Sequence, residues 1–150
     1  LCVDFICTLA CFPGLVTSLP SRTLGLQHGW FPILLITCYN LGDFIGKSSV
    51  RYWQIFDYNT IHWPLIPQMV FPVLVFFGVQ GIGPLNDGYF LVLVLALGIS
   101  TGYIATSALS IGPHLVPDEE KHLAGMIDSF FLLSGLFIGA WTGLIVSFCM

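Results

Sequence analysis

Five long apolar runs, separated by short connectors, dominate the sequence; they span residues 1–19, 30–52, 63–81, 89–111 and 122–148. A helix needs about 20 mainly apolar residues to cross the hydrocarbon core of a bilayer. Only 8% of the 150 residues are charged, whereas a soluble domain carries about 25%. The chain therefore cannot cover a water-facing surface. We expect an all-α polytopic membrane protein with five transmembrane helices embedded in the lipid bilayer.

Prolines and glycines add detail to three of these runs. Pro13 predicts a kink in the first run, and Pro67 and Pro72 predict a bent or partly irregular third run. Glycines four residues apart predict faces on which helix backbones approach closely. These glycines are Gly98 and Gly102 in the fourth run, and Gly135, Gly139 and Gly143 in the fifth.

The second run carries a polar stripe. Asn40, Asp43 and Lys47 recur every three to four residues, one turn beyond Ile36, so a helix places them on one face. Each charge at mid-bilayer costs about 2.5–3.5 kcal/mol, so a chain that keeps both charges pairs them or uses them. A carboxylate beside an ammonium suits a sugar-like ligand with adjacent hydroxyls. A buried ion pair, with Lys47 reaching the nearby interface, fits the spacing equally well.

The other polar residues of the apolar runs favour structural roles. Asp4 and Asp128 are isolated acids, and intramembrane acids serve as proton relays or ligand contacts. However, Asp4 lies near a helix end and Asp128 only about two turns into its run, which favours a structural position. An unrelated ion-coupled carrier, built on these two acids, stays open. The hydroxyl-rich segment 100–110 favours helix packing over the lining of a polar cavity.

Several function classes find no support in the sequence. The net charge of −4 argues against a nucleic-acid partner. The four histidines form no paired pattern that would bind a metal ion, and no phosphate-binding glycine loop or nucleophile motif occurs. We therefore expect no enzyme, no metal site and no cofactor.

A family resemblance covers essentially the whole chain. The segment Tyr39-Asn40-x-x-Asp43-x-x-Gly46-Lys47 resembles the signature of the eighth of the eleven helices in the equilibrative nucleoside transporter family, solute carrier family 29. Three further matches follow in the family's order. Phe12-Pro13 is similar to the end of its seventh helix, Gly102-Tyr103 and Gly112-Pro113 to its tenth, and Ala124-Gly125, Phe130-Phe131, Gly135 and Gly139 to its eleventh.

The resemblance implies a fold and a function. Residues 1–150 would form the five-helix C-terminal bundle of a major-facilitator-like transporter whose N-terminal bundle is absent from this chain. The implied function is facilitative transport of nucleosides or nucleobases by alternating access, in a multi-pass protein of the plasma or vacuolar membrane. The family's ribose-contacting acid and base map to Asp43 and Lys47. Its neighbouring cavity positions map to Asn40, Ile36, Phe12, Leu133 and Leu136.

The chain departs from the family in ways that bear on function. Many members carry Arg where this chain has Lys47, and a lysine is a point donor without the planar fork of a guanidinium. An acid at Asp128 is not part of the family's pattern. Alternating access needs two bundles around one site, so one bundle alone cannot enclose a nucleoside. The alternative is therefore a truncated, non-transporting membrane polypeptide that acts at most through contacts with other membrane helices.

Overall fold

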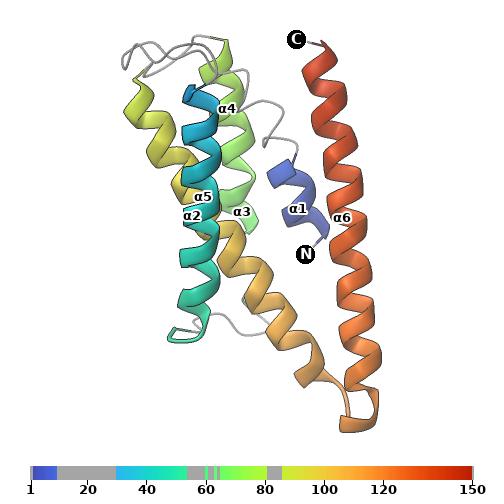
Figure 1. Cartoon of the computed structure of the whole chain (residues 1–150). Helices are drawn as coiled ribbons and strands as arrows, with labels where there is room; N and C mark the ends of the chain where they lie inside the picture. The colour runs from blue at the N-terminus through green and yellow to red at the C-terminus, as the bar shows by residue number, and fades with distance from the viewer. Residues whose placement is uncertain are drawn as a thin grey trace.

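The computed structural model describes residues 2–9, 30–53, 60, 63, 65–80 and 86–149. These residues form helices and turns, and no strand occurs among them. The helices are α1 (Cys2–Leu9), α2 (Trp30–Val50), α3 (Leu65–Gln68), α4 (Val70–Val79), α5 (Asp87–Ile111) and α6 (Lys121–Cys149). The 3-10 turns η2 (Gly112–Leu115) and η3 (Asp118–Glu120) connect α5 to α6. Figure 1 shows α2 along α5 on one side of the molecule and α1 beside α6 on the other.

Three helices begin and end close to the predicted limits of their apolar runs, namely α2, α5 and α6. Two segments, Asp87–Leu115 and Asp118–Ile145, are long and apolar enough to cross a membrane. The helix α2 has 21 residues, but the polar stripe lowers its mean hydropathy. The described parts of the first and third runs are shorter than one crossing requires. The structure thus establishes two candidate membrane spans within the described residues, and the five predicted crossings remain a prediction.

The third apolar run is broken, as its prolines predict. The helix α3 ends at Gln68 and α4 begins at Val70, with a turn at Met69 between them. Pro72 has no N–H, so the carbonyl of Gln68, four residues earlier, cannot have its usual helical partner. The break therefore falls where the sequence removes a backbone hydrogen bond. The kink predicted at Pro13 lies outside the described residues.

Among the described residues, α2 and α5 pack backbone against backbone through four glycines, Gly42, Gly46, Gly98 and Gly102, which we call the glycine seam. A methyl group added to Gly98 would collide with the backbone oxygen of Tyr39, and one added to Gly46 with that of Ile99. The two backbones therefore touch directly, which only residues without a side chain allow. The predicted close-approach face at Gly98 and Gly102 is confirmed, and Gly42 and Gly46 form its counterpart on α2.

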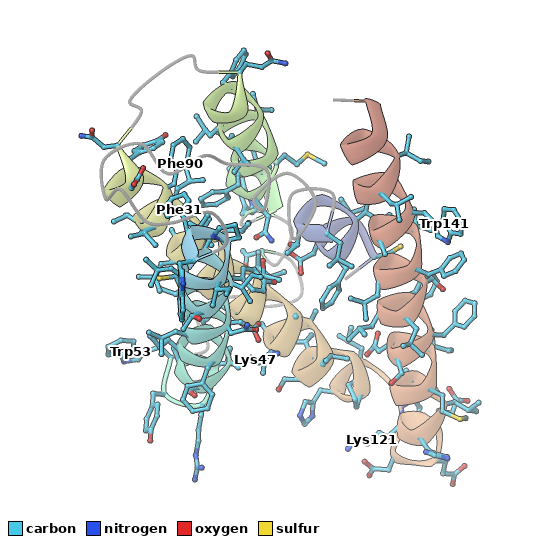
Figure 2. All side chains as sticks on the ribbon, turned by 45° about the horizontal axis from the view of Figure 1, so that its top comes forward. Phe31, Lys47, Trp53, Phe90, Lys121 and Trp141 are labelled. Atoms are coloured by element: carbon cyan, nitrogen blue, oxygen red, sulfur yellow. The ribbon has the colours of Figure 1, made fainter. Side chains whose placement is uncertain are left out.

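An apolar cluster closes the packing at one end of the α2–α5 pair. Phe31 and Leu35 of α2 and Phe90 of α5 are buried, and Figure 2 shows the rings of Phe31 and Phe90 near each other. The helix α4 contributes Val75, which is fully buried against them. The cluster thus fixes the register of α2 on α5 beyond the seam.

The helix α6 packs on α1 and, through Asp128, on the start of η2, and it leaves much of its remaining surface uncovered. A methyl group added to Gly135 would lie 2.9 Å from the Cα of Cys2, and one on Gly139 would lie 2.8 Å from the backbone oxygen of Phe5. The two glycines therefore let α1 approach the backbone of α6. Large side chains elsewhere on α6 are exposed, and Trp141 points away from the other helices (Figure 2). This surface is apolar enough to be covered by lipid or by further helices.

Candidate functional site

The polar stripe is present on α2, and its charges are paired. The Nζ of Lys47 lies 2.6 Å from the Oδ2 of Asp43, one helical turn earlier. The Asp43 side chain is 22% exposed and that of Lys47 is 53% exposed, so the acid lies against the protein while the base reaches outward. The exposed Asn40 donates its amide to the carbonyl oxygen of Ile36 at 3.0 Å. The stripe therefore presents a carboxylate and an ammonium side by side on a partly open face of α2, the helix on which Figure 2 labels Lys47.

Asp43 packs against α5 at Gly102. A methyl group on Gly102 would collide with the backbone oxygen of Asp43 and lie 2.9 Å from its Oδ1. The carboxylate thus rests on α5 at a position where that helix has no side chain. The next residue, Tyr103, donates its hydroxyl to the carbonyl oxygen of Trp53 at 2.8 Å. Both contacts hold the C-terminal half of α2, and the residues that follow it, against α5.

The remaining predicted site residues lie on two helices. Ile36 is half-buried on α2, one turn before Asn40. Leu133 is exposed and Leu136 half-buried on α6, which stands across the molecule from α2 (Figure 1). Phe12 lies outside the described residues. The structure therefore brings Asn40, Asp43 and Lys47 together on one face of α2. Leu133 and Leu136 lie on α6, apart from this face.

A second polar site lies in the interior, where α1, α3 and α5 meet; we call it the buried polar cluster. It consists of Asp4, Thr8, Gln68 and Thr101, each at most 1% exposed. The amide Nε2 of Gln68 lies 2.5 Å from the Oδ1 of Asp4 and 2.9 Å from the Oγ1 of Thr101. It also lies 3.1 Å from the Oγ1 of Thr8.

The sequence analysis did not predict this cluster. It placed Asp4 near a helix end and did not single out Gln68, although a glutamine in an apolar run is itself a signal of a buried polar contact. The four-residue spacing of Asp4 and Thr8 also indicates a polar face on α1. Asp4 lies in the first turn of α1, near a helix end as predicted, and it is fully buried within the cluster.

Asp128 occupies a separate position at the junction of α5 and η2. Its Oδ2 is buried and has no hydrogen-bond partner. A methyl group on Gly112 would collide with this carboxylate. Asp128 therefore contacts the end of α5, far along the chain from the polar stripe.

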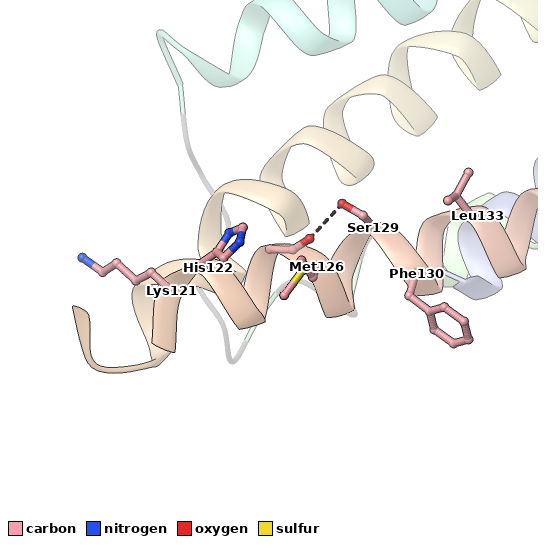
Figure 3. Close-up of a pocket in the computed structure, with 7 residues that line it drawn as sticks. Lys121, His122, Met126, Ser129, Phe130 and Leu133 are labelled. Carbon is pink, nitrogen blue, oxygen red and sulfur yellow. Dashed lines mark hydrogen bonds between the residues drawn. The ribbon is translucent and has the colours of Figure 1, made fainter. Parts of the chain in front are cut away.

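An open hollow of about 530 Å³ lies on the surface of α6 near its first turns (Figure 3). Its lining comes from this helix alone: Lys121, His122, Gly125, Met126, Ser129, Phe130 and Leu133. The hydroxyl of Ser129 donates to the carbonyl oxygen of Gly125 at 2.8 Å, so its hydrogen is used within the helix. Across the described ranges, no three His, Cys, Asp or Glu side chains gather as metal ligands. The hollow is thus a depression in a helix surface and not an enclosed site.

Comparison with known proteins gives a consistent result. A family model described as "Nucleoside transporter" matches residues 1–149. Equilibrative nucleotide transporter 8 of Arabidopsis thaliana is 34% identical over 140 residues, which cover 91% of this chain and 35% of that protein. Equilibrative nucleoside transporter 1 of Homo sapiens is 27% identical over 150 residues, covering 93% of this chain and 33% of that protein. No solved structure matches the chain.

The chain spans about a third of the length of the curated relatives that it matches. These relatives are named as transporters and not as enzymes. The two long apolar segments of α5 and α6 agree with an integral membrane protein. The match over nearly every residue shows that this chain belongs to the nucleoside transporter family.

Proposed function

We propose that this chain is the C-terminal bundle of a facilitative nucleoside transporter, with residues 1–150 as one unit of five membrane-crossing helices. The family match over residues 1–149 supports this proposal, as does the coverage of about a third of each relative. A major-facilitator-like arrangement requires a second, N-terminal bundle, which other residues of the intact protein would supply. The bundle would reside in the plasma membrane or the vacuolar membrane.

The proposed substrate contact is the Asp43–Lys47 pair, and its geometry carries the proposal. A carboxylate accepts hydrogen bonds from two neighbouring hydroxyls, and an ammonium donates to their oxygens. The two groups are 2.6 Å apart and partly exposed, so a ribose can reach both at once. Asn40 and Ile36 continue the same face of α2. The resemblance also assigns Phe12, Leu133 and Leu136 to the cavity; because Leu133 and Leu136 lie on α6, across the molecule from α2, we propose that they contact the substrate away from the ion pair.

The proposed mechanism is alternating access around this pair. Substrate bound to α2 is enclosed only when the opposing bundle closes over that face, and it is released when the bundles rock apart. No step uses an energy source, so net flux follows the nucleoside gradient. A nucleobase lacks the ribose, so its binding would depend on the apolar residues of the proposed cavity and not on Asp43 and Lys47.

The substitution Asp43→Asn in the intact protein tests the site. A hydrogen bond to a charged group contributes about 1.5–3 kcal/mol, so we expect nucleoside uptake to fall about tenfold or more. The assay is uptake of radiolabelled nucleosides and nucleobases at matched surface expression. Asp118→Asn is the matched control because Asp118 pairs with Lys121 at 2.5 Å in an exposed turn away from α2.

Two results would contradict the proposal at different levels. Equal nucleoside uptake by Asp43→Asn and the parent protein would contradict the assignment of Asp43 to the ribose site but not the proposed transport function. If the parent protein takes up no nucleoside and no nucleobase, the transport function itself is refuted. Loss of uptake in Asp118→Asn would show that the assay responds to any lost ion pair.

A further inference from the structure

Asp43 rests on one turn of α5, between two glycines of the seam. A methyl group added to Gly98 would lie 3.0 Å from the backbone nitrogen of Asp43. One added to Gly102 would lie 3.0 Å from the backbone carbonyl carbon of Asp43 and 2.9 Å from its Oδ1. The backbone of α5 therefore touches Asp43 on both sides of its Cα. We call residues 97–102 of α5 the platform turn, because the position of the carboxylate depends on the shape of this turn.

Thr101 fixes the platform turn from the side that faces α1 and α3. Its hydroxyl donates to the backbone oxygen of Leu97 at 2.9 Å, so this hydrogen bond spans the turn. The same hydroxyl oxygen accepts a hydrogen bond from the Nε2 of Gln68 at 2.9 Å. A threonine that bonds to the carbonyl four residues earlier often bends its helix. The hydroxyl of Thr101 thus sets the curvature of the turn against which Asp43 rests.

Gln68 ties this hydroxyl to helices outside the α2–α5 pair. Its Nε2 lies 2.5 Å from the Oδ1 of Asp4 on α1, in addition to its contact with Thr101. All three residues are at most 1% exposed, so water does not compete for these hydrogen bonds. A hydrogen bond is electrostatically stronger in such an interior than in water. The platform turn is therefore anchored to α1 and α3 through the hydroxyl of Thr101.

Thr101 cannot contact a bound nucleoside in this conformation, because its side chain is buried. Its influence on the substrate would pass through the platform turn to Asp43. Small shifts are sufficient, since a hydrogen bond from a hydroxyl to a carboxylate keeps the two oxygens about 2.5–2.7 Å apart. A carboxylate displaced by a few tenths of an ångström would leave this range for one of the two ribose hydroxyls.

We propose that Thr101 is a positioning residue of the ribose site, a role that rests on the transport function and the ribose contact of Asp43 proposed above. Its hydroxyl, held by Gln68, keeps the platform turn bent so that the carboxylate of Asp43 reaches both ribose hydroxyls at once. The affinity for nucleosides is thereby set in part by a residue that the substrate does not touch.

The test measures the KM of radiolabelled uridine uptake by the intact protein at matched surface expression. Thr101→Val keeps the shape of the side chain and removes the hydroxyl; we expect the KM to rise about fivefold, the effect of weakening one hydrogen bond to a charged group. Thr101→Ser keeps the hydroxyl and should restore the KM of the parent. Thr8→Val is the matched control because Thr8 loses the same group from the same cluster but lies on α1, and it should keep the parent KM.

A double-mutant cycle separates positioning from a general loss of stability. If Thr101 acts through Asp43, Thr101→Val should cause no further rise in KM once Asp43→Asn is present, so the two effects are not additive. A merely structural role would multiply the KM by the same factor in both backgrounds. Gln68→Met keeps the test independent of how well Thr101→Val folds. It removes the donor to Thr101 without changing α5, and it should raise the KM in the parent background alone.

Each of the remaining outcomes overturns a definite statement. A parent-like KM in both Thr101→Val and Gln68→Met overturns the positioning role, as does an equal rise with and without Asp43→Asn. A rise in Thr8→Val as large as that in Thr101→Val overturns the specific role of the platform turn. A parent-like KM in Asp43→Asn alone refutes the ribose site and, with it, this role. Absence of any uptake by the parent refutes the transport function itself.

Discussion

The substitution Gly102→Ala tests how α5 holds Asp43, the acid proposed to bind substrate. The added methyl would lie 2.9 Å from Asp43 Oδ1 and 3.0 Å from its backbone carbonyl carbon, and it would collide with the backbone oxygen. Ordinary contacts of a Cβ begin at 3.4 Å, so α2 and α5 must separate by about half an ångström or more. Backbone atoms cannot rotate out of the way as a side chain can.

The magnitude follows from two opposing effects. Overpacking of a well-packed interior costs about 1–3 kcal/mol, whereas alanine is favoured over glycine within a helix by about 1 kcal/mol. Since the contact is with backbone, we place the cost in the upper half of its range. The free energy of unfolding should fall by about 1–2 kcal/mol. The displaced carboxylate should also raise the KM for nucleoside uptake.

The assay combines thermal denaturation of the purified intact protein with concentration-dependent uptake. Gly125→Ala is the control because a Cβ at Gly125 meets no atom within 4 Å, so this variant should be as stable as the parent or more so. The reasoning is refuted if Gly102→Ala matches Gly125→Ala in both stability and KM. Such a result would mean that the seam opens without cost.

Three further substitutions probe the ion pair, the buried polar cluster and the contact between α1 and α6. Lys47→Met leaves Asp43 unpaired and should lower nucleoside uptake about tenfold, whereas Lys47→Arg keeps the charge and should retain uptake at matched surface expression. Gln68→Leu removes the donor to Asp4 and should lower the free energy of unfolding by about 1–3 kcal/mol, measured by thermal denaturation; unchanged stability would contradict the cluster. Gly139→Ala should cost about 1–2 kcal/mol in the same assay, and equal stability to the Gly125→Ala control would disprove close α1–α6 packing.

Much of the helical layout was predictable because it depends on local composition. The second run was predicted over 30–52, and α2 occupies Trp30–Val50. The third run was predicted to be irregular from its prolines, and it breaks at Met69. Apolar length and proline position act within a few residues, so no tertiary information was needed. The number of membrane crossings depends in addition on the bilayer and on residues outside the described ranges.

Of the candidate site, only the contacts within a single helix could be predicted from the sequence. Asp43 and Lys47 lie four residues apart, so a helix alone brings them together. Gly102 was predicted as a packing residue, but its role as the support of Asp43 depends on how two distant helices align. The contacts of the buried polar cluster between helices join residues 33 to 93 positions apart, and pairings of that range leave no periodic signal. Gln68 therefore passed unnoticed in a run that otherwise predicts apolar packing.

The glycine seam has a mechanical consequence for the whole chain. At the four seam glycines α2 and α5 touch backbone to backbone, so no side chain lies between them there that could repack, and relative sliding of the two helices is resisted at these points. We therefore expect α2 and α5 to move together as one rigid body when the protein changes conformation. Asp43 lies on α2 and Thr101 on α5. Any movement of Asp43, the proposed ribose contact, would therefore also move Thr101 of the buried polar cluster.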